Sequence, residues 1–99
     1  MGREEMTEAE VFARLGEVVQ SELGDTFPFT WDAPLSDGTD RGDFRKARIM
    51  ECAENLFDMH IPYDVEDALV TVRDLIRDLT WRVNGSHGHH PILGARGVA

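Results

Sequence analysis

The sequence of 99 residues has one cysteine, Cys52, and lacks any long apolar run. A single cysteine excludes an intramolecular disulfide framework. No apolar stretch approaches the length of a membrane-spanning helix, and the N-terminal Met1-Gly2-Arg3-Glu4-Glu5 lacks the pattern of a signal peptide. We therefore expect a cytoplasmic protein with no membrane partner.

Basic residues are also scarce. Lys and Arg number 10 against 19 Asp and Glu, which gives a net charge of −9 at pH 7. Because the phosphates of DNA or RNA would be repelled, we expect no nucleic-acid partner. The charge suits a protein partner with a basic docking patch, although acidity that only favours solubility explains it equally well.

A nucleophile–base pair and a cofactor motif are missing too. Cys52 lies inside a predicted helix with no lysine or histidine beside it in the sequence, and His60 stands at a helix end. We therefore predict no enzyme activity. His87, His89 and His90 have no carboxylate or thiol beside them, so we predict no native metal site there.

Apolar residues recur at helical spacing, and we predict one all-α domain over residues 7–83 with helices near 7–23, 43–59, 64–69 and 71–83. Thr7 and Thr71 begin Thr-x-x-acid capping motifs. Asp43 is predicted to cap the second helix, because its carboxylate can accept from first-turn N–H groups. Residues 1–6 are expected to be frayed, and residues 84–99 to form a disordered tail.

The predicted core consists of apolar positions from three of these helices: Val11, Leu15, Val18, Phe44, Met50, Phe57, Leu75, Ile76 and Leu79. A long connection over residues 25–42 carries Phe27, Phe29 and Trp31. We expect these rings to anchor the connection over one end of the helices, since isolated exposed aromatics are disfavoured. An aromatic docking patch is the alternative.

Four short motifs keep a continuous frame: Ala33-Pro34-Leu35, Leu56-Phe57, Ile61-Pro62 and Thr71-Val72-Arg73-Asp74-Leu75-Ile76. Their order and spacing, from Ala33 to Leu79, resemble those of the acyl carrier protein family. The resemblance implies a four-helix bundle with a long loop between the first two helices. In that family a D-S-L motif opens the second helix, and its serine carries 4′-phosphopantetheine. Here Gly42-Asp43-Phe44 occupies that position, so Asp43 replaces the serine.

Aspartate has no hydroxyl with which to attack the pyrophosphate of coenzyme A. The resemblance therefore implies a carrier-like protein that holds no phosphopantetheine cofactor, in which Asp43 either only caps the helix or partly mimics the missing phosphate. Two alternatives stay open. The first is a working carrier modified at another serine, of which Ser36 is better placed than Ser21 or Ser86. The second is a generic helical adaptor.

The first turns of this helix are basic, at positions where the family commonly has acidic or neutral residues. Positive charge near a helix N-terminus is unfavourable by a few tenths of a kcal/mol, so helix stability does not explain it. Pairing of Arg48 with Glu51, or of Asp43 with Lys46, would make an ordinary solvated face. We favour a rewired docking surface, which accepts an acidic patch and is formed by Phe44, Arg45, Lys46, Arg48 and Glu51.

The resemblance places the expected protein partners among the enzymes of fatty acid, polyketide or peptide assembly. We expect the chain to meet them as a monomer.

Overall fold

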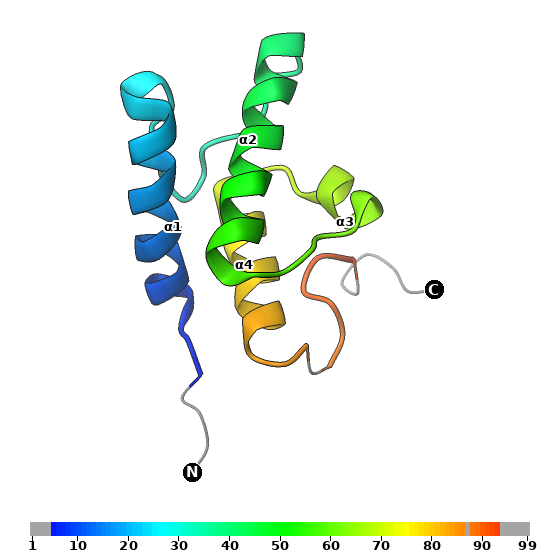
Figure 1. The fold of residues 1–99 in the computed structure, drawn as a ribbon. Coiled ribbons are helices and arrows are strands. Elements are labelled where there is room, and N and C mark those ends of the chain that lie inside the picture. Colours follow the sequence, from blue (N-terminus) through cyan, green and yellow to red (C-terminus); the bar gives the residue numbers. More distant parts are fainter. Residues whose placement is uncertain (1–4, 87, 94–99) are drawn as a thin grey trace.

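The computed structural model describes residues 5–86 and 88–93, and these residues form an all-α fold. The elements are α1 (Glu8–Leu23), the 3-10 turn η1 (Gly24–Thr26), α2 (Asp40–Phe57), α3 (Tyr63–Ala68) and α4 (Val72–Val83). α1 packs against both α2 and α4. Figure 1 shows α1 and α2 side by side, with the short α3 on the side of α2 away from α1. The predicted all-α class is confirmed.

Strands and membrane helices are not found in this part of the chain. Its only extended pairing is an isolated antiparallel bridge between Pro34 and Thr71. No helix in the described ranges combines the length and the apolarity needed to cross a bilayer.

The capping motifs of α1 and α4 form as predicted. Thr7 Oγ1 accepts from the Glu10 N–H at 3.1 Å, and Glu10 Oε1 accepts from the Thr7 N–H at 2.8 Å. Thr71 and Asp74 exchange the same pair of hydrogen bonds, each at 3.2 Å. These bonds satisfy first-turn N–H groups that have no partner within a helix.

α2 begins three residues before the predicted start, and Asp43 is not its cap. Thr39 is the N-cap, and its Oγ1 accepts from the Gly42 N–H at 3.0 Å. Asp43 lies one turn inside the helix, where its N–H donates to Thr39 O at 2.9 Å. The prediction was wrong because Thr39 and Asp43 are both good caps. The loop before α2 decides between them.

Most of the predicted core is buried, namely Val11, Leu15, Met50, Leu75, Ile76 and Leu79, while Val18 and Phe57 are partly buried against it. Phe44 was wrongly placed in the core, because its side chain is 75% exposed. The face of α2 that meets the other helices carries Ile49 and Ala53, both fully buried. Phe44 precedes Ile49 by five residues, which places it about 140° around the helix.

The long connection between α1 and α2 is anchored by its aromatic rings, as predicted. Phe27 is buried, and the Phe12 ring lies 4.3 Å from Trp31 and 4.9 Å from Phe29, between ring centroids. The connection also pairs with the start of α4, since the Leu35 N–H donates to Val70 O at 2.9 Å. These rings therefore pack within the protein, whereas the alternative of an aromatic docking patch would have them contact a partner.

Residues 88–93 lie against α4 rather than extending as the predicted disordered tail. His90 Nε2 lies 2.6 Å from Asp78 Oδ1. Near the other terminus, the Met6 N–H donates to Asn84 Oδ1, and Asn84 Nδ2 donates to Met6 O, both at 2.9 Å. The rest of the predicted tail, 87 and 94–99, and residues 1–4 of the predicted frayed segment lie outside the described residues.

Candidate functional site

Residue 43, where the resemblance would place an attachment serine, lies at the surface near the start of α2. Asp43 is exposed there, and its Oδ1 accepts from Ser36 Oγ at 2.7 Å. Ser36 Oγ in turn accepts from the Gly38 N–H at 3.1 Å. The Asp43 carboxylate is therefore hydrogen-bonded to a hydroxyl of the loop that precedes α2.

Asp37 holds this loop in shape. Its Oδ1 accepts from Thr39 Oγ1 at 2.6 Å and from the Thr39 N–H at 3.0 Å. The hydroxyl, followed by the N–H, lowers the pKa of the Asp37 carboxyl. The stabilisation that accompanies a lowered pKa is present above the pKa of the unfolded chain and is lost as the pH falls through the folded value. The loop is therefore held in this form at neutral pH.

Gly42 lets the loop lie directly on α2. A Cβ atom at this position would collide with Asp37 Oδ1, and would lie 2.8 Å from Asp37 N and 2.9 Å from Ser36 Oγ. Any larger residue must therefore displace the segment that positions Ser36 beside Asp43.

We predict that Gly42→Ala destabilises the protein. A glycine-to-alanine change inside an exposed helix normally stabilises by about 1 kcal/mol. Here the added methyl group must push the loop away, which is expected to cost about 1–3 kcal/mol. Urea unfolding followed by circular dichroism measures the change. Ala47→Gly, on an exposed part of α2, is the control and should show the ordinary propensity loss. A stabilised Gly42→Ala variant would show that the loop does not rest on the helix.

Three of the predicted docking residues meet in a groove between the end of α1 and the start of α2. This α2 groove is lined by Leu23, Thr26, Arg41, Phe44, Arg45 and Arg48. Lys46 is not part of its lining. Glu51 lies farther along α2, in a hollow shared with Glu22 and Arg48. Sequence reasoning missed Arg41, because the predicted helix started after it.

The arginines of the α2 groove have different partners. Arg48 Nη2 donates to Glu22 Oε1 of α1 at 2.8 Å, in place of the pairing with Glu51 that the alternative of an ordinary solvated face assigned to it. Both side chains are half exposed, so this ion pair contributes at most about 1 kcal/mol. The Arg45 guanidinium lies 4.8 Å from the centroid of the Phe27 ring. Among the described residues, Arg41 has no ion pair, and it is exposed.

The second pairing of that alternative, between Asp43 and Lys46, is also replaced. Asp43 binds Ser36, and no ion pair joins it to Lys46 within the part of the chain that the structure describes. Both residues thus have a partner outside α2: Asp43 binds Ser36 of the preceding loop, and Arg48 binds Glu22 of α1. Among the described residues, the basic side chains in the first half of α2 therefore form no ion pair with Asp40 or Asp43 of its first turn.

Cys52 and His60 occupy ordinary structural positions. Cys52 is buried, and burial, with a smaller effect of the Glu22 carboxylate, raises the pKa of its thiol. A raised pKa disfavours the reactive thiolate. His60 is exposed, and its Nδ1 lies 3.3 Å from Glu54 Oε2. Within the described part of the chain, neither side chain faces a second group with which it could form a nucleophile–base pair.

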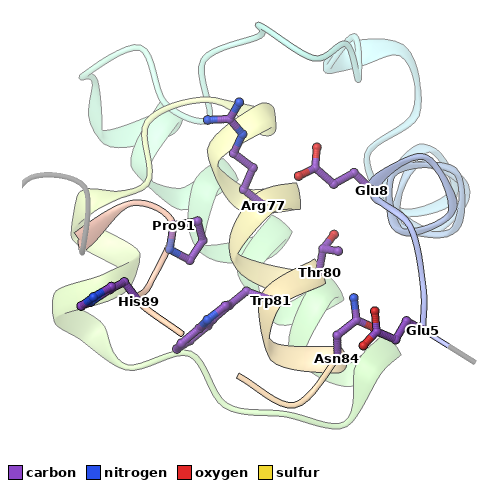
Figure 2. Close-up of a pocket in the computed structure, with 8 residues that line it drawn as sticks. All are labelled: Glu5, Glu8, Arg77, Thr80, Trp81, Asn84, His89 and Pro91. Atoms are coloured by element: carbon purple, nitrogen blue, oxygen red, sulfur yellow. The ribbon is translucent and has the colours of Figure 1, made fainter. Parts of the chain in front are cut away.

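A second hollow lies between α4 and the residues near both termini. Figure 2 shows its lining residues, which are Glu5, Glu8, Arg77, Thr80, Trp81, Asn84, His89 and Pro91. No three His, Cys, Asp or Glu side chains within the described ranges are grouped to hold a metal ion. His89 lines the hollow, His90 is bound to Asp78, and His87 lies outside the described residues.

Asp78 is fully buried and holds the segment around His90 against α4. Its two oxygens accept from Arg82 Nε at 2.9 and 3.1 Å, and His90 Nε2 lies 2.6 Å from one of them. His90 Nδ1 accepts from the N–H groups of Ile92 and Leu93, at 3.0 and 2.9 Å. Nδ1 is therefore unprotonated, and Nε2 carries the hydrogen that Asp78 accepts. The sequence signal was the i, i+4 spacing of Asp78 and Arg82 within an amphipathic helix.

Comparison with protein-family models finds no match for this chain, and comparisons with curated proteins and with solved structures find none either.

Proposed function

We propose that this protein has a bundle of acyl-carrier-protein type, holds no phosphopantetheine and acts through protein–protein contacts made by the α2 groove. Two features support a carrier-type fold over a generic helical adaptor. One is the long connection between α1 and α2, and the other is the short helix α3, Tyr63–Ala68.

The observation that carries the proposal is the environment of Asp43. Its carboxylate is exposed and adjoins a groove with an exposed phenylalanine and three arginines. Only the resemblance equates position 43 with the family's serine. Loss of the attachment hydroxyl and gain of positive charge thus occur at one surface. A surface of this kind repels basic partners and attracts acidic ones, which is how charged docking sites select their partners.

The setting that we propose is a fatty acid, polyketide or peptide assembly system, in which the chain serves as a scaffold, decoy or regulator. This part of the proposal rests on the resemblance alone, because a fold does not determine a function.

A second candidate function, a carrier modified at Ser36, has one observation in its favour. Ser36 Oγ lies 2.7 Å from Asp43 Oδ1, which could accept its proton. The serine oxygen would attack the pyrophosphate of coenzyme A, 3′,5′-ADP would leave, and phosphopantetheine would stay on Ser36. We favour the first proposal, because the hydroxyl is already held by Asp43 and by the Gly38 N–H.

We predict that incubation with coenzyme A and a promiscuous phosphopantetheinyl transferase leaves the intact mass unchanged. The physical reason is the missing hydroxyl at position 43, since the nearby hydroxyls of Ser36 and Thr39 already donate to Asp43 and Asp37. Mass spectrometry of the whole chain before and after the reaction gives the answer, with a known acyl carrier protein as the positive control.

Ser36→Ala separates the two candidates. A gain of one phosphopantetheine by the wild-type chain that is absent from Ser36→Ala would refute the first proposal and support the second. Asp43→Ser tests whether position 43 is equivalent to the attachment serine of the family. A mass gain in that variant alone would show that this chain lacks only the hydroxyl.

A further inference from the structure

The exposed large apolar side chains of the described residues are Phe44, at 75% exposure, Tyr63, at 77%, and Val70, at 60%. They fall into two places. Phe44 lies in the α2 groove, whereas Tyr63 begins α3 and Val70 follows its end. Large exposed apolar side chains that are grouped with charged residues are typical of interaction surfaces.

The two places carry opposite charge. In the α2 groove, Phe44 lies among Arg41, Arg45 and Arg48. Tyr63 and Val70 are accompanied by exposed acidic side chains, and we define the α3 surface as Tyr63, Asp64, Asp67 and Val70. Positions 63, 64 and 67 share one face of a helix, since residues three and four apart are neighbours on its surface.

One molecule cannot bring these two surfaces together. The groove opens between the end of α1 and the start of α2, where Glu22 and Arg48 are joined. The α3 helix lies on the other side of α2 from α1 (Figure 1). Any pairing of the two surfaces must therefore involve two molecules.

We propose that the α2 groove of one copy receives the α3 surface of a second copy. Phe44 packs against Tyr63 and Val70, and the exposed Arg41 pairs with Asp67. This inference rests on the proposed docking role of the α2 groove and identifies its occupant, in place of the monomer that the sequence analysis expects.

Charge is the basis for choosing a second copy as the occupant. The chain has a net charge of −9, and four of its 10 basic residues, Arg41, Arg45, Lys46 and Arg48, lie in the first half of α2. An acidic surface is what this region attracts, and the α3 surface supplies it together with matching apolar side chains. Repulsion between two acidic chains keeps the association weak.

Sedimentation velocity of the full chain over a wide concentration range tests the proposal. We expect the wild type to sediment faster as its concentration rises. Arg41→Glu damages only the groove and Asp67→Lys only the α3 surface, so each variant alone is expected to associate at least about tenfold more weakly. Arg14→Glu and Glu17→Lys, exposed on α1 outside both surfaces, are matched controls and should associate like the wild type.

A mixture of the two damaged variants gives the sharpest result. Arg41→Glu keeps an intact α3 surface and Asp67→Lys keeps an intact groove, so the equimolar mixture should recover association that neither variant shows alone. Circular dichroism shows whether both variants are folded. A wild type that stays monomeric at every concentration, or a mixture that does not recover, would overturn the proposal.

These outcomes are independent of the intact-mass test. A monomer whose mass stays unchanged would refute the second copy as occupant and leave the non-carrying interaction protein in place. A mass gain by the wild type would refute that function, whatever the state of association.

Discussion

Replacement of Asp78 by alanine is expected to lower the free energy of unfolding by about 3–5 kcal/mol, the range found when one partner of a buried ion pair is removed. The Asp78 side chain is completely buried, and its oxygens accept from Arg82 and lie within hydrogen-bonding distance of His90. Alanine would leave the mostly buried Arg82 guanidinium without its counter-charge. The segment around His90 would at the same time lose its attachment to α4.

Thermal or urea unfolding of Asp78→Ala measures this effect. Hydrogen exchange of the Ile92 and Leu93 amides, which donate to His90 Nδ1, reports release of the segment separately. Arg77→Ala changes an exposed residue of the same helix and should stay within about 0.5 kcal/mol of the wild type. Equal stability of Asp78→Ala and Arg77→Ala would contradict the buried cluster.

His90→Ala completes a double-mutant cycle with Asp78→Ala. Because the two side chains are in contact, their combined effect should be smaller than the sum of the single effects. Additive effects would mean that His90 does not act through Asp78.

The two phenylalanines Phe27 and Phe44 are expected to respond very differently to replacement by alanine. Phe27 is 2% exposed, so Phe27→Ala should cost about 3–5 kcal/mol of unfolding free energy, as expected for a large buried side chain. Because Phe44 is exposed, Phe44→Ala should lower the free energy of unfolding by less than about 0.5 kcal/mol. Its loss should instead weaken self-association, by at least about tenfold for an aromatic residue at the centre of an interface.

Unfolding and sedimentation of both variants measure these effects, and each variant is the control for the other. If Phe44→Ala were as destabilised as Phe27→Ala, Phe44 would be a buried core residue, as the sequence pattern predicts. A stable Phe44→Ala variant that associates like the wild type would remove Phe44 from the interface and leave only the charges.

Phe44 shows why the candidate site could be predicted only in part. Sequence spacing correctly places Phe44, Arg45 and Arg48 near the start of one helix, and the structure brings these three into one groove. The pattern cannot tell which way Phe44 points, because that depends on the rotation of α2 against α1 and α4. The true start of the helix, at Asp40, also adds Arg41 to the site.

The sequence by itself determined the features that depend on near neighbours in the chain. These are the all-α class, the caps at Thr7 and Thr71 and most of the apolar core. Capping bonds and amphipathic faces join residues three or four positions apart, so their pattern can be recognised in the sequence alone.

Only the tertiary structure decided the contacts that join distant parts of the chain. Ser36 and Asp43 are separated by 7 positions, His90 and Asp78 by 12, and Arg48 and Glu22 by 26. A charged side chain within one helix has several possible partners at similar sequence distance, and the energies of exposed pairs differ by less than about 1 kcal/mol. Packing of the loop and of α1 against α2 selects among them, since it determines which groups come within hydrogen-bonding distance and which are buried.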